Sequence, residues 1–202
     1  MNKKMFLPFL SLFLTLTLLS TFVCVYSQQK VYASGVSLYE NNESGSDLDT
    51  FSGAVWKAQT FTPAVAHTVT SVRLELEKIG NPQGNIIVSI RATDANGAPT
   101  GTDLTSGSIP CSNLKNIASW YEFDMSSGYA LQANTQYAIC WSAPSGDNAD
   151  EIGYIVNCKG VYASGSVFQS YSAGISNSWG VISNGTWDAV FEEWGTGIPP
   201  PR

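Results

Sequence analysis

The sequence has few charged residues and very few of the residue types that most catalytic or metal-binding sites require. Charged residues make up 13% of the 202 residues, and His67 is the single histidine. No Cys-x-x-Cys pair occurs, which argues against a thiolate zinc site. A Gly-x-Ser-x-Gly elbow, a phosphate-binding glycine loop and a dinucleotide-binding glycine pattern are also absent. These absences disfavour the common classes of hydrolase and nucleotide-binding enzyme.

The residues that could serve catalysis do not form a recognisable set. His67 lies in the segment Ala-Val-Ala-His-Thr, so we expect a histidine in a surface loop and not a member of a Ser-His-Asp triad. A glycosidase needs two carboxylates facing each other across a cleft. Glu192-Glu193 and Asp150-Glu151 are adjacent pairs, and adjacent residues of a strand point to opposite faces. We therefore expect that the protein is not an enzyme.

Basic residues are scarce as well. The chain has 10 Lys and Arg residues against 16 Asp and Glu residues, which gives a formal net charge of −6. Nucleic-acid binding requires clustered Lys and Arg side chains that displace counterions from phosphates. The sequence therefore predicts no nucleic-acid partner.

The N-terminus has the layout of a secretory signal peptide. Lys3 and Lys4 precede an apolar run over residues 5–26, and Val31-Tyr32-Ala33 offers small or medium residues before a cut at Ala33/Ser34. The alternative is an uncleaved membrane anchor, because the apolar run is about as long as a spanning helix needs. A lipoprotein is less favoured, because Thr-Phe-Val precedes Cys24. Either way we expect a secreted or extracellular protein associated with the cell surface, with membrane contact only through this segment or an anchor outside the sequence.

The rest of the chain is expected to form one domain. We assign residues 1–33 to the signal peptide, which we expect to be helical, 34–195 to the folded domain and 196–202 to a Pro-rich tail. There is no internal repeat and no linker in mid-chain. Residues 40–50 are rich in Asn, Ser, Asp and Glu and are predicted to be a long loop or a flexible entry to the domain.

Hydrophobic alternation indicates β-strands. Val72, Leu74 and Leu76 alternate with charged residues, and residues 85–93 repeat the pattern. Asn81-Pro-Gln-Gly84 lies between them and has the composition of a turn, so a hairpin is predicted. A second turn, Asp94-Ala-Asn-Gly97, follows. Further strands are expected near residues 36–39, 58–62, 120–125, 136–142, 152–158 and 186–194.

Strands of this kind bury one face only, so two antiparallel sheets packed face to face are the expected architecture. The predicted fold class is all-β, an antiparallel β-sandwich or jelly roll.

Three cysteines follow the predicted cleavage site. Cys140 and Cys158 flank an expected strand–loop–strand unit and are the favoured disulfide pair in an exported protein. Cys111, in a loop-like Ile-Pro-Cys-Ser-Asn segment, could replace either partner. Three buried free thiols are the alternative.

Several segments, taken in order, resemble the choice-of-anchor R domains of bacterial and archaeal surface proteins and, more loosely, jelly-roll carbohydrate-binding modules. The resemblance extends from Tyr39 to Gly195. It rests on the segments Trp56-Lys-Ala-Gln-Thr-Phe-Thr-Pro63, Thr70-Ser-Val-Arg-Leu-Glu-Leu76, Val88-Ser-Ile-Arg91, Gly97-Ala-Pro-Thr-Gly-Thr-Asp-Leu104, Trp120-Tyr-Glu-Phe123, Asn134-Thr-Gln-Tyr-Ala-Ile139 and Trp187-Asp-Ala-Val-Phe-Glu-Glu-Trp-Gly195.

The resemblance implies a β-sandwich attached to a cell surface or to a larger exported protein, and it carries no catalytic residues. Two features depart from the family. The three cysteines are not part of its pattern, and no sorting signal follows Gly195. An uncleaved N-terminal segment, a continuation of the chain or simple secretion would each account for the missing anchor.

Aromatic residues provide the best candidates for a binding site. The chain has 6 tryptophans, and Trp179 and Trp187 lie with Tyr162 and Tyr171 in a region rich in Gly, Ser and Asn. Aromatic faces stack on the apolar faces of sugars, and nearby amides bind the hydroxyls. A glycan site at these residues is therefore a hypothesis. The alternative is that they fill the core, which is favoured for Trp187 because it shares strand parity with Ala189 and Phe191.

A structural Ca²⁺ is a further candidate. Jelly-roll modules often use calcium to hold the opening loop against the last strand through oxygen ligands. Asp188, with Glu40, Asp47 and Asp49 from the opening region, could supply them.

Three functional hypotheses follow. The leading one is a non-catalytic exported surface or adhesion module that acts by binding or display, with glycans or another surface protein as partners. The second is a carbohydrate-binding module, and the last is a small secreted hydrolase with His67 beside a Ser or Cys.

Overall fold

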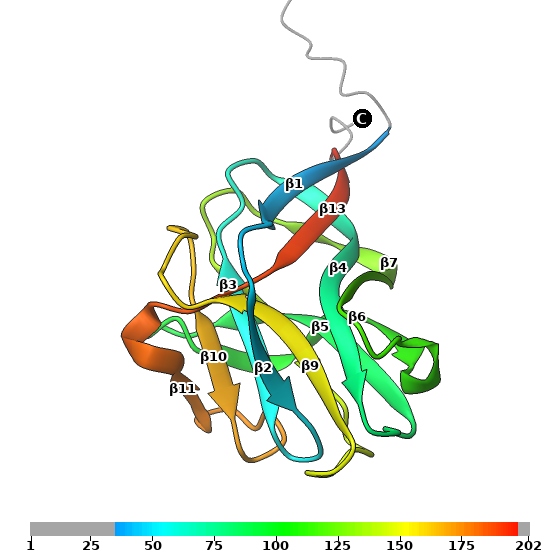
Figure 1. Ribbon diagram of the computed structural model, residues 1–202. Helices are drawn as coiled ribbons and strands as arrows, with labels where there is room; N and C mark the ends of the chain where they lie inside the picture. The colour runs from blue at the N-terminus through cyan, green and yellow to red at the C-terminus, as the bar shows by residue number, and fades with distance from the viewer. Residues whose placement is uncertain (1–34, 198–202) are drawn as a thin grey trace, which may run out of the picture. The chain divides into compact units, whose positions relative to one another are not determined.

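The computed structural model describes residues 35–197, which form two antiparallel β-sheets packed face to face (Figure 1). Sheet A has the order β1-β13-β4-β9-β12, with β2 beside β9 and β7 beside β4. Its strands are β1 (Val36–Asn42), β2 (Asp47–Phe51), β4 (His67–Ile79), β7 (Ser119–Leu131), β9 (Glu151–Asn157), β12 (Asp188–Ala189) and β13 (Phe191–Gly197).

Sheet B has the order β11-β10-β3-β8-β5-β6. Its strands are β3 (Trp56–Phe61), β5 (Asn85–Thr93), β6 (Pro99–Pro110), β8 (Tyr137–Ser142), β10 (Val167–Ser170) and β11 (Trp179–Val181), and two short 3₁₀ turns, η1 (Cys111–Asn113) and η2 (Ile182–Gly185), connect them to neighbouring strands. All strand pairs in both sheets are antiparallel, which confirms the predicted β-sandwich.

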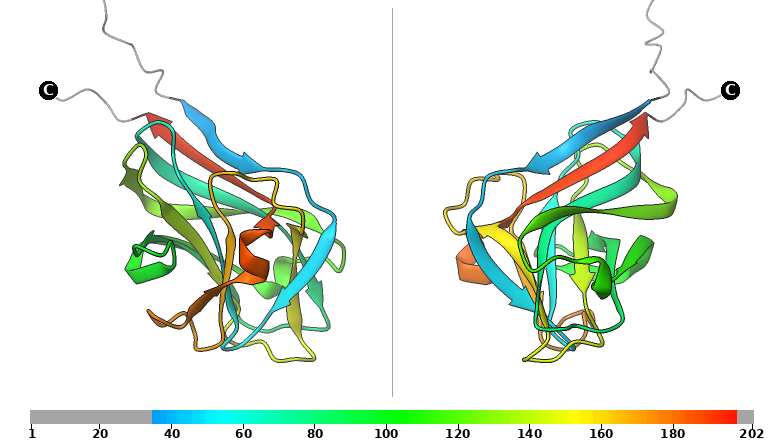
Figure 2. Two further views of the ribbon diagram at one scale, coloured as in Figure 1. Left: turned by 90° about the vertical axis from the view of Figure 1, so that its left-hand side faces the viewer. Right: turned by 45° about the vertical axis from the view of Figure 1, so that its right-hand side comes forward.

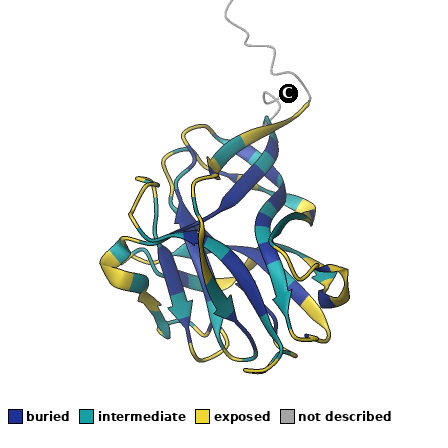
Figure 3. Cartoon of the chain, in the orientation of Figure 1, coloured by how far each residue is buried: buried dark blue, intermediate teal, exposed yellow. Residues whose placement is uncertain are grey.

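The core lies between the sheets, as Figure 3 shows by the dark-blue strand centres and yellow loops. Leu74 and Leu76 of β4 belong to the same buried cluster as Ile90 of β5, and all three are at most 1% exposed. Burial of side chains of this size contributes roughly 1.5–3 kcal/mol each. Trp141 of β8 packs edge-on against Tyr154 of β9, with ring centroids 5.2 Å apart, and so joins the two sheets.

The alternating pattern that predicted β4 and β5 is confirmed, but the predicted hairpin between them is wrong. β4 pairs with strands of sheet A, whereas β5 pairs with β6 and β8 in sheet B. The segment Asn81-Pro-Gln-Gly84 therefore crosses from one sheet to the other. Alternation reveals that a strand has one buried face, but strands of both sheets bury that face in the same core. The turn Asp94–Gly97 does join a hairpin, β5 to β6, and Gly97 donates its N–H to the Asp94 carbonyl.

Residues 40–50 are not the long loop that the sequence predicts, because they include the end of β1 and most of β2. The strands β6, β10 and β11 were also not anticipated. The strand expected over 186–194 is divided by Val190, whose N–H donates to the Ile155 carbonyl. Strand β13 continues to Gly197, two residues beyond the predicted end of the domain.

The first and last strands of the domain lie side by side. Val36 of β1 is opposite Thr196 of β13, and both views in Figure 2 show the two strands running together along one end of the sandwich. The predicted signal peptide and residues 198–202 of the predicted tail lie outside the described residues. Within the described residues, no helix is long and apolar enough to span a membrane.

The predicted Cys140–Cys158 disulfide is not formed, and Cys111, Cys140 and Cys158 are free thiols. Cys140 lies on β8 in sheet B, on the face turned away from the main core. Cys158 follows β9 of sheet A and packs against the main core. The prediction treated the two segments as neighbouring strands, but they belong to different sheets.

Candidate functional site

An open groove of about 980 Å³ lies over the outer face of sheet B, the face turned away from sheet A. We call it the sheet B groove. It is lined by Thr60, Thr62, Asp94, Asn96, Gly97, Ala98, Gln136, Ala163, Ser164, Gly165, Ser166, Phe168, Asn177, Trp179, Val181, Asn184 and Gly185.

The floor of the groove follows from residues that face each other across neighbouring strands. Phe168 of β10 lies between Val181 of β11 and Ala58 of β3. Cross-strand partners point to the same face of a sheet, so these side chains form one apolar row. Trp179, two residues before Val181, packs against the small cluster that Phe168 forms with the alanines of β3 and β8.

Segments between the strands form the walls. The β5–β6 turn is fixed by the Asp94 carboxylate, whose Oδ1 accepts hydrogen bonds from the N–H groups of Asn96 and Ala98 at 2.8 and 3.0 Å. Asn177 and Asn184 have φ angles of 69° and 55°. Asparagine adopts this left-handed region more readily than most residues. These two asparagines therefore have a backbone role as well as an amide in the groove.

The other end of the same sheet face is covered. The loop over residues 171–178 folds onto it, and Gly174 lies against the ring of Trp56. The guanidinium of Arg91 lies 5.2 Å from the centroid of that ring. Arg91 also donates to the Gly174 carbonyl at 2.7 Å and to the Asp103 carboxylate at 2.6 Å. One half of this sheet face is thus covered by the 171–178 loop, which Arg91 holds in place. The other half remains open as the groove.

The groove is suited to binding polar molecules that have an apolar face. Trp179 and Phe168 offer aromatic surface, while Asn96 and Gln136 line the groove with side-chain amides that both donate and accept hydrogen bonds. Sugars present this combination of apolar faces and hydroxyl groups.

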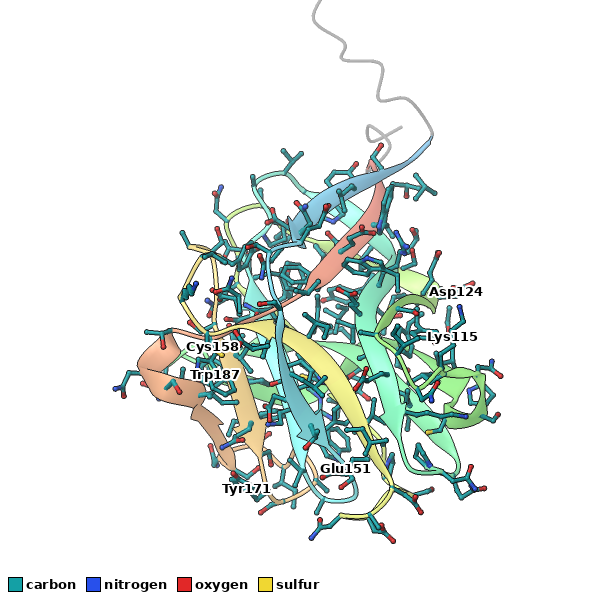
Figure 4. The ribbon with its side chains drawn as sticks, in the orientation of Figure 1. Lys115, Asp124, Glu151, Cys158, Tyr171 and Trp187 are labelled. Carbon is teal, nitrogen blue, oxygen red and sulfur yellow. The ribbon has the colours of Figure 1, made fainter. Side chains whose placement is uncertain are left out.

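Of the four aromatics that the sequence singled out, the structure brings Trp179 alone into the groove. Tyr171 is 67% exposed and lies beyond the end of β10, whereas the Trp187 carbonyl accepts the N–H of Val167 at the start of that strand. Figure 4 shows Trp187 and Tyr171 near opposite ends of β10. Trp187 packs against the core, which confirms the alternative interpretation for this residue.

Tyr162 belongs to a buried polar cluster that also contains Tyr39, Glu40, His67 and Glu193, which we call the His67 cluster. The Tyr162 hydroxyl donates to Glu40 at 2.9 Å, and the ring packs edge-on against Phe191. Burial raises the pKa of the Tyr162 phenol, and the Glu40 carboxylate raises it further. Tyr162 is therefore a structural hydrogen-bond donor and does not line the sheet B groove.

The expectation of a surface histidine is wrong. His67 begins β4, is fully buried, and stacks on Tyr39 with ring centroids 3.7 Å apart. Its Nδ1 lies 2.8 Å from the Val65 carbonyl, and its Nε2 lies 2.8 and 2.9 Å from the two carboxylate oxygens of Glu193. A carbonyl only accepts hydrogen bonds, so Nδ1 carries a proton and a second proton lies between Nε2 and Glu193.

The pKa directions agree with this arrangement. Burial would lower the pKa of His67, but the hydrogen bond to Glu193 and the charge of that carboxylate outweigh it, so the pKa is raised. Burial raises the pKa of the Glu193 carboxyl against the opposing effect of His67. Glu192, the neighbour of Glu193, points to the opposite face and binds Arg73 at 2.6 Å, as the strand parity predicts.

The four carboxylates predicted as calcium ligands do not converge. Asp49 accepts from Lys57 at 2.6 Å and from the Tyr154 hydroxyl at 2.7 Å, so its charge is already paired. Asp47 precedes it on β2, while Glu40 and Asp188 lie at Tyr162. No group of three or more Asp, Glu, His or Cys residues with metal-binding geometry occurs within residues 35–197. These residues do not fit the predicted ion.

Sequence reasoning did not identify Phe168, Asn96, Gln136, Asn177 or Asn184 as groove residues. The turn composition around Asn96 and the Asn-rich stretch that ends at Asn184 were recognised, but as turns and loops. Their common place in the groove depends on pairing between distant strands, which the sequence does not show.

The fold and the groove define a class: a β-sandwich with a polar–aromatic depression on one outer sheet face. A comparison with models of known protein families finds no match, and a comparison with curated proteins finds none either.

Among solved structures, the chain is similar to two of the cysteine protease Cwp84. The first, the clostridial protease after propeptide cleavage, has a TM-score of 0.54 and 15% sequence identity, over 82% of this chain and 41% of that chain. The second contains the cysteine protease and lectin-like domains of Cwp84, a surface layer associated protein of Clostridium difficile. It has a TM-score of 0.50 and 16% identity, over 82% of this chain and 37% of that chain. This chain thus spans less than half the length of either structure, and the likeness shows a shared fold.

Proposed function

We propose that the protein is a non-catalytic, exported cell-surface module that binds carbohydrate in the sheet B groove. The observation that carries the proposal is the groove itself: Trp179 and Phe168 supply an apolar platform, and amide side chains surround it. Aromatic platforms of this kind stack on sugar rings, and amides bind the hydroxyl groups in and around the ring plane.

Two further observations support the proposal. An all-β chain matches structures that include a lectin-like domain, and we infer that the match falls on that domain and not on the protease. The predicted signal peptide would take the protein to the surface where such modules act. The resemblance to choice-of-anchor R domains is compatible with this function and stays a prediction.

A glycan array with the purified protein tests the proposal. We expect at least one oligosaccharide to bind, and we expect Trp179→Ala to weaken that binding about tenfold, because the variant loses about 1.4 kcal/mol of stacking and apolar contact. Tyr171→Ala is the matched control, since Tyr171 is an exposed aromatic nearby but outside the groove.

Circular dichroism of both variants checks that they remain folded. If the protein binds no glycan, or if a folded Trp179→Ala variant retains full affinity, the groove is not a carbohydrate site.

A further inference from the structure

The lining of the sheet B groove carries very little charge. Among the described residues that line it, Asp94 is the only charged side chain, and the others are apolar, hydroxyl or amide residues and glycines. Asp94 is exposed, and its Oδ1 is held in place by the backbone of its own turn. The groove therefore presents one fixed negative charge without a facing cation.

The two basic residues that β3 and β5 contribute are both committed elsewhere. Arg91 lies on the outer face of sheet B, but its guanidinium is bound to Asp103 and to the Gly174 carbonyl under the 171–178 loop. Lys57 of β3 is 3% exposed and binds Asp49 and Gln169 between the sheets. Neither side chain can reach a ligand in the groove without breaking a buried contact.

A carboxylate or phosphate in this groove would lose water without gaining a counter-charge. Burying an unpaired charge is unfavourable, and the Asp94 carboxylate would add repulsion. An uncharged sugar avoids both costs, because its hydroxyl groups can exchange water for the amides of Asn96 and Gln136.

We infer that the sheet B groove selects uncharged carbohydrate chains and rejects acidic ones. This inference rests on the proposed function and names the ligand class of the same site. Trp179 and Phe168 bind the apolar face of a neutral ring, the amides bind its hydroxyls, and the Asp94 carboxylate excludes uronic, sialic and phosphorylated sugars.

Matched ligand pairs test the inference. Cello-, manno- and chito-oligosaccharides and their C6-carboxylated forms differ in charge but share a backbone, and titration calorimetry gives the affinity for each. We expect the carboxylated form of the bound sugar to be at least about tenfold weaker, as removal of a hydrogen-bonded hydroxyl and repulsion from Asp94 together require.

Two variants assign the effect to the groove. Asp94→Asn keeps the side-chain oxygen that caps the turn but removes the charge. We therefore expect the difference in affinity between the neutral and the carboxylated sugar to narrow about three- to tenfold at low salt. Asn96→Lys introduces a cation at an exposed position and should narrow it further.

The outcomes separate the inference from the function on which it rests. If carboxylated sugars bind as tightly as neutral ones and Trp179→Ala abolishes both, the groove is a glycan site but the inference is wrong. The inference is also wrong if Asp94→Asn leaves this difference in affinity unchanged. If neither form of any sugar binds, the proposed function fails and the inference fails with it.

Discussion

The sheet B groove and the His67 cluster differ in the types of residue that form them and in their exposure to solvent. The groove is open to solvent, and uncharged amides, hydroxyls and aromatics line it around the single carboxylate of Asp94. The His67 cluster is closed: His67 and Glu193 are 0% exposed, and their polar atoms are bonded to one another or to backbone. The residues that look most reactive are therefore the ones that water reaches least.

The difference teaches that residue type alone is a poor guide to function in this protein. His67 and Glu193 have the chemistry of an acid–base pair, yet Tyr39 covers the imidazole and the pair ties β4 to β13. Asn96 and Gln136 have no acid–base chemistry, yet they stand where a ligand has access. If the His67 cluster serves stability and the sheet B groove serves binding, variants in the first should change the free energy of unfolding and variants in the second should change ligand affinity.

Removal of Glu193 should have the largest effect on stability. Glu193→Ala leaves the proton-bearing His67 without a partner in the core, and breaking a buried pair on one side costs about 3–5 kcal/mol. We expect the free energy of unfolding, measured by urea denaturation, to fall by this amount. Glu122→Ala is the control, because Glu122 is exposed on β7 and its loss should change stability by less than about 0.5 kcal/mol.

The double variant His67→Leu with Glu193→Leu sharpens this test. It removes both partners and leaves no charge unpaired, so it should be clearly more stable than Glu193→Ala. A double variant as unstable as the single one would show that the pair stabilises the fold through something other than its charge. In either variant, a folded protein should keep its glycan affinity, because the cluster does not line the groove.

The comparison of the two regions also shows which strands and which site residues can be predicted from the sequence. Strands β4 and β5 were predictable because Val72, Leu74, Val88 and Ile90 alternate with polar residues and bury one face. The pairing of those strands was not predictable, since both sheets bury the same kind of face. Trp179 was recognised as a binding candidate from its surroundings of Gly, Ser and Asn.

The rest of the groove could not be predicted, because its walls come from segments far apart in the chain. Phe168 lies in a region whose composition predicts loop, yet β10 pairs there with β3 through backbone bonds that depend on no side-chain pattern. His67 was misassigned for a related reason. The flanking residues Ala66 and Thr68 give no sign of the Glu193 partner, which lies 126 residues later.

Arg91 holds the 171–178 loop on the outer face of sheet B, and its removal should have an intermediate effect. Arg91→Ala breaks charged hydrogen bonds to Asp103 and Gly174, so we expect a loss of about 1.5–3 kcal/mol in the free energy of unfolding. The 171–178 loop carries Asn177 into the groove, so affinity for the bound glycan should fall as well. Arg91→Lys keeps the charge but cannot make both bonds, and should lie between wild type and Arg91→Ala.

Affinity that is unchanged in a measurably destabilised Arg91→Ala variant would limit the role of Arg91 to the covered half of the sheet face. It would also show that the loop over 171–178 has no part in ligand binding. Both quantities come from the same preparations, by urea denaturation and titration calorimetry.

The smallest expected effect is a dependence of stability on pH that originates in the His67 cluster. The pKa of His67 is raised in the folded state, so its contribution is fully present below the unfolded value of 6.5 and is lost as the pH rises through the folded value. We therefore expect the free energy of unfolding to decrease above pH 6.5, with a slope no steeper than about 1.4 kcal/mol per pH unit for one proton. Because His67 is the only histidine in the chain, no other histidine contributes to this slope.

The His67→Leu, Glu193→Leu double variant should lose the slope between pH 6.5 and 8, whereas Trp179→Ala should keep it. A slope that persists in the double variant would mean that a group outside the His67 cluster titrates in this range. It would contradict the assignment of the pH dependence to His67.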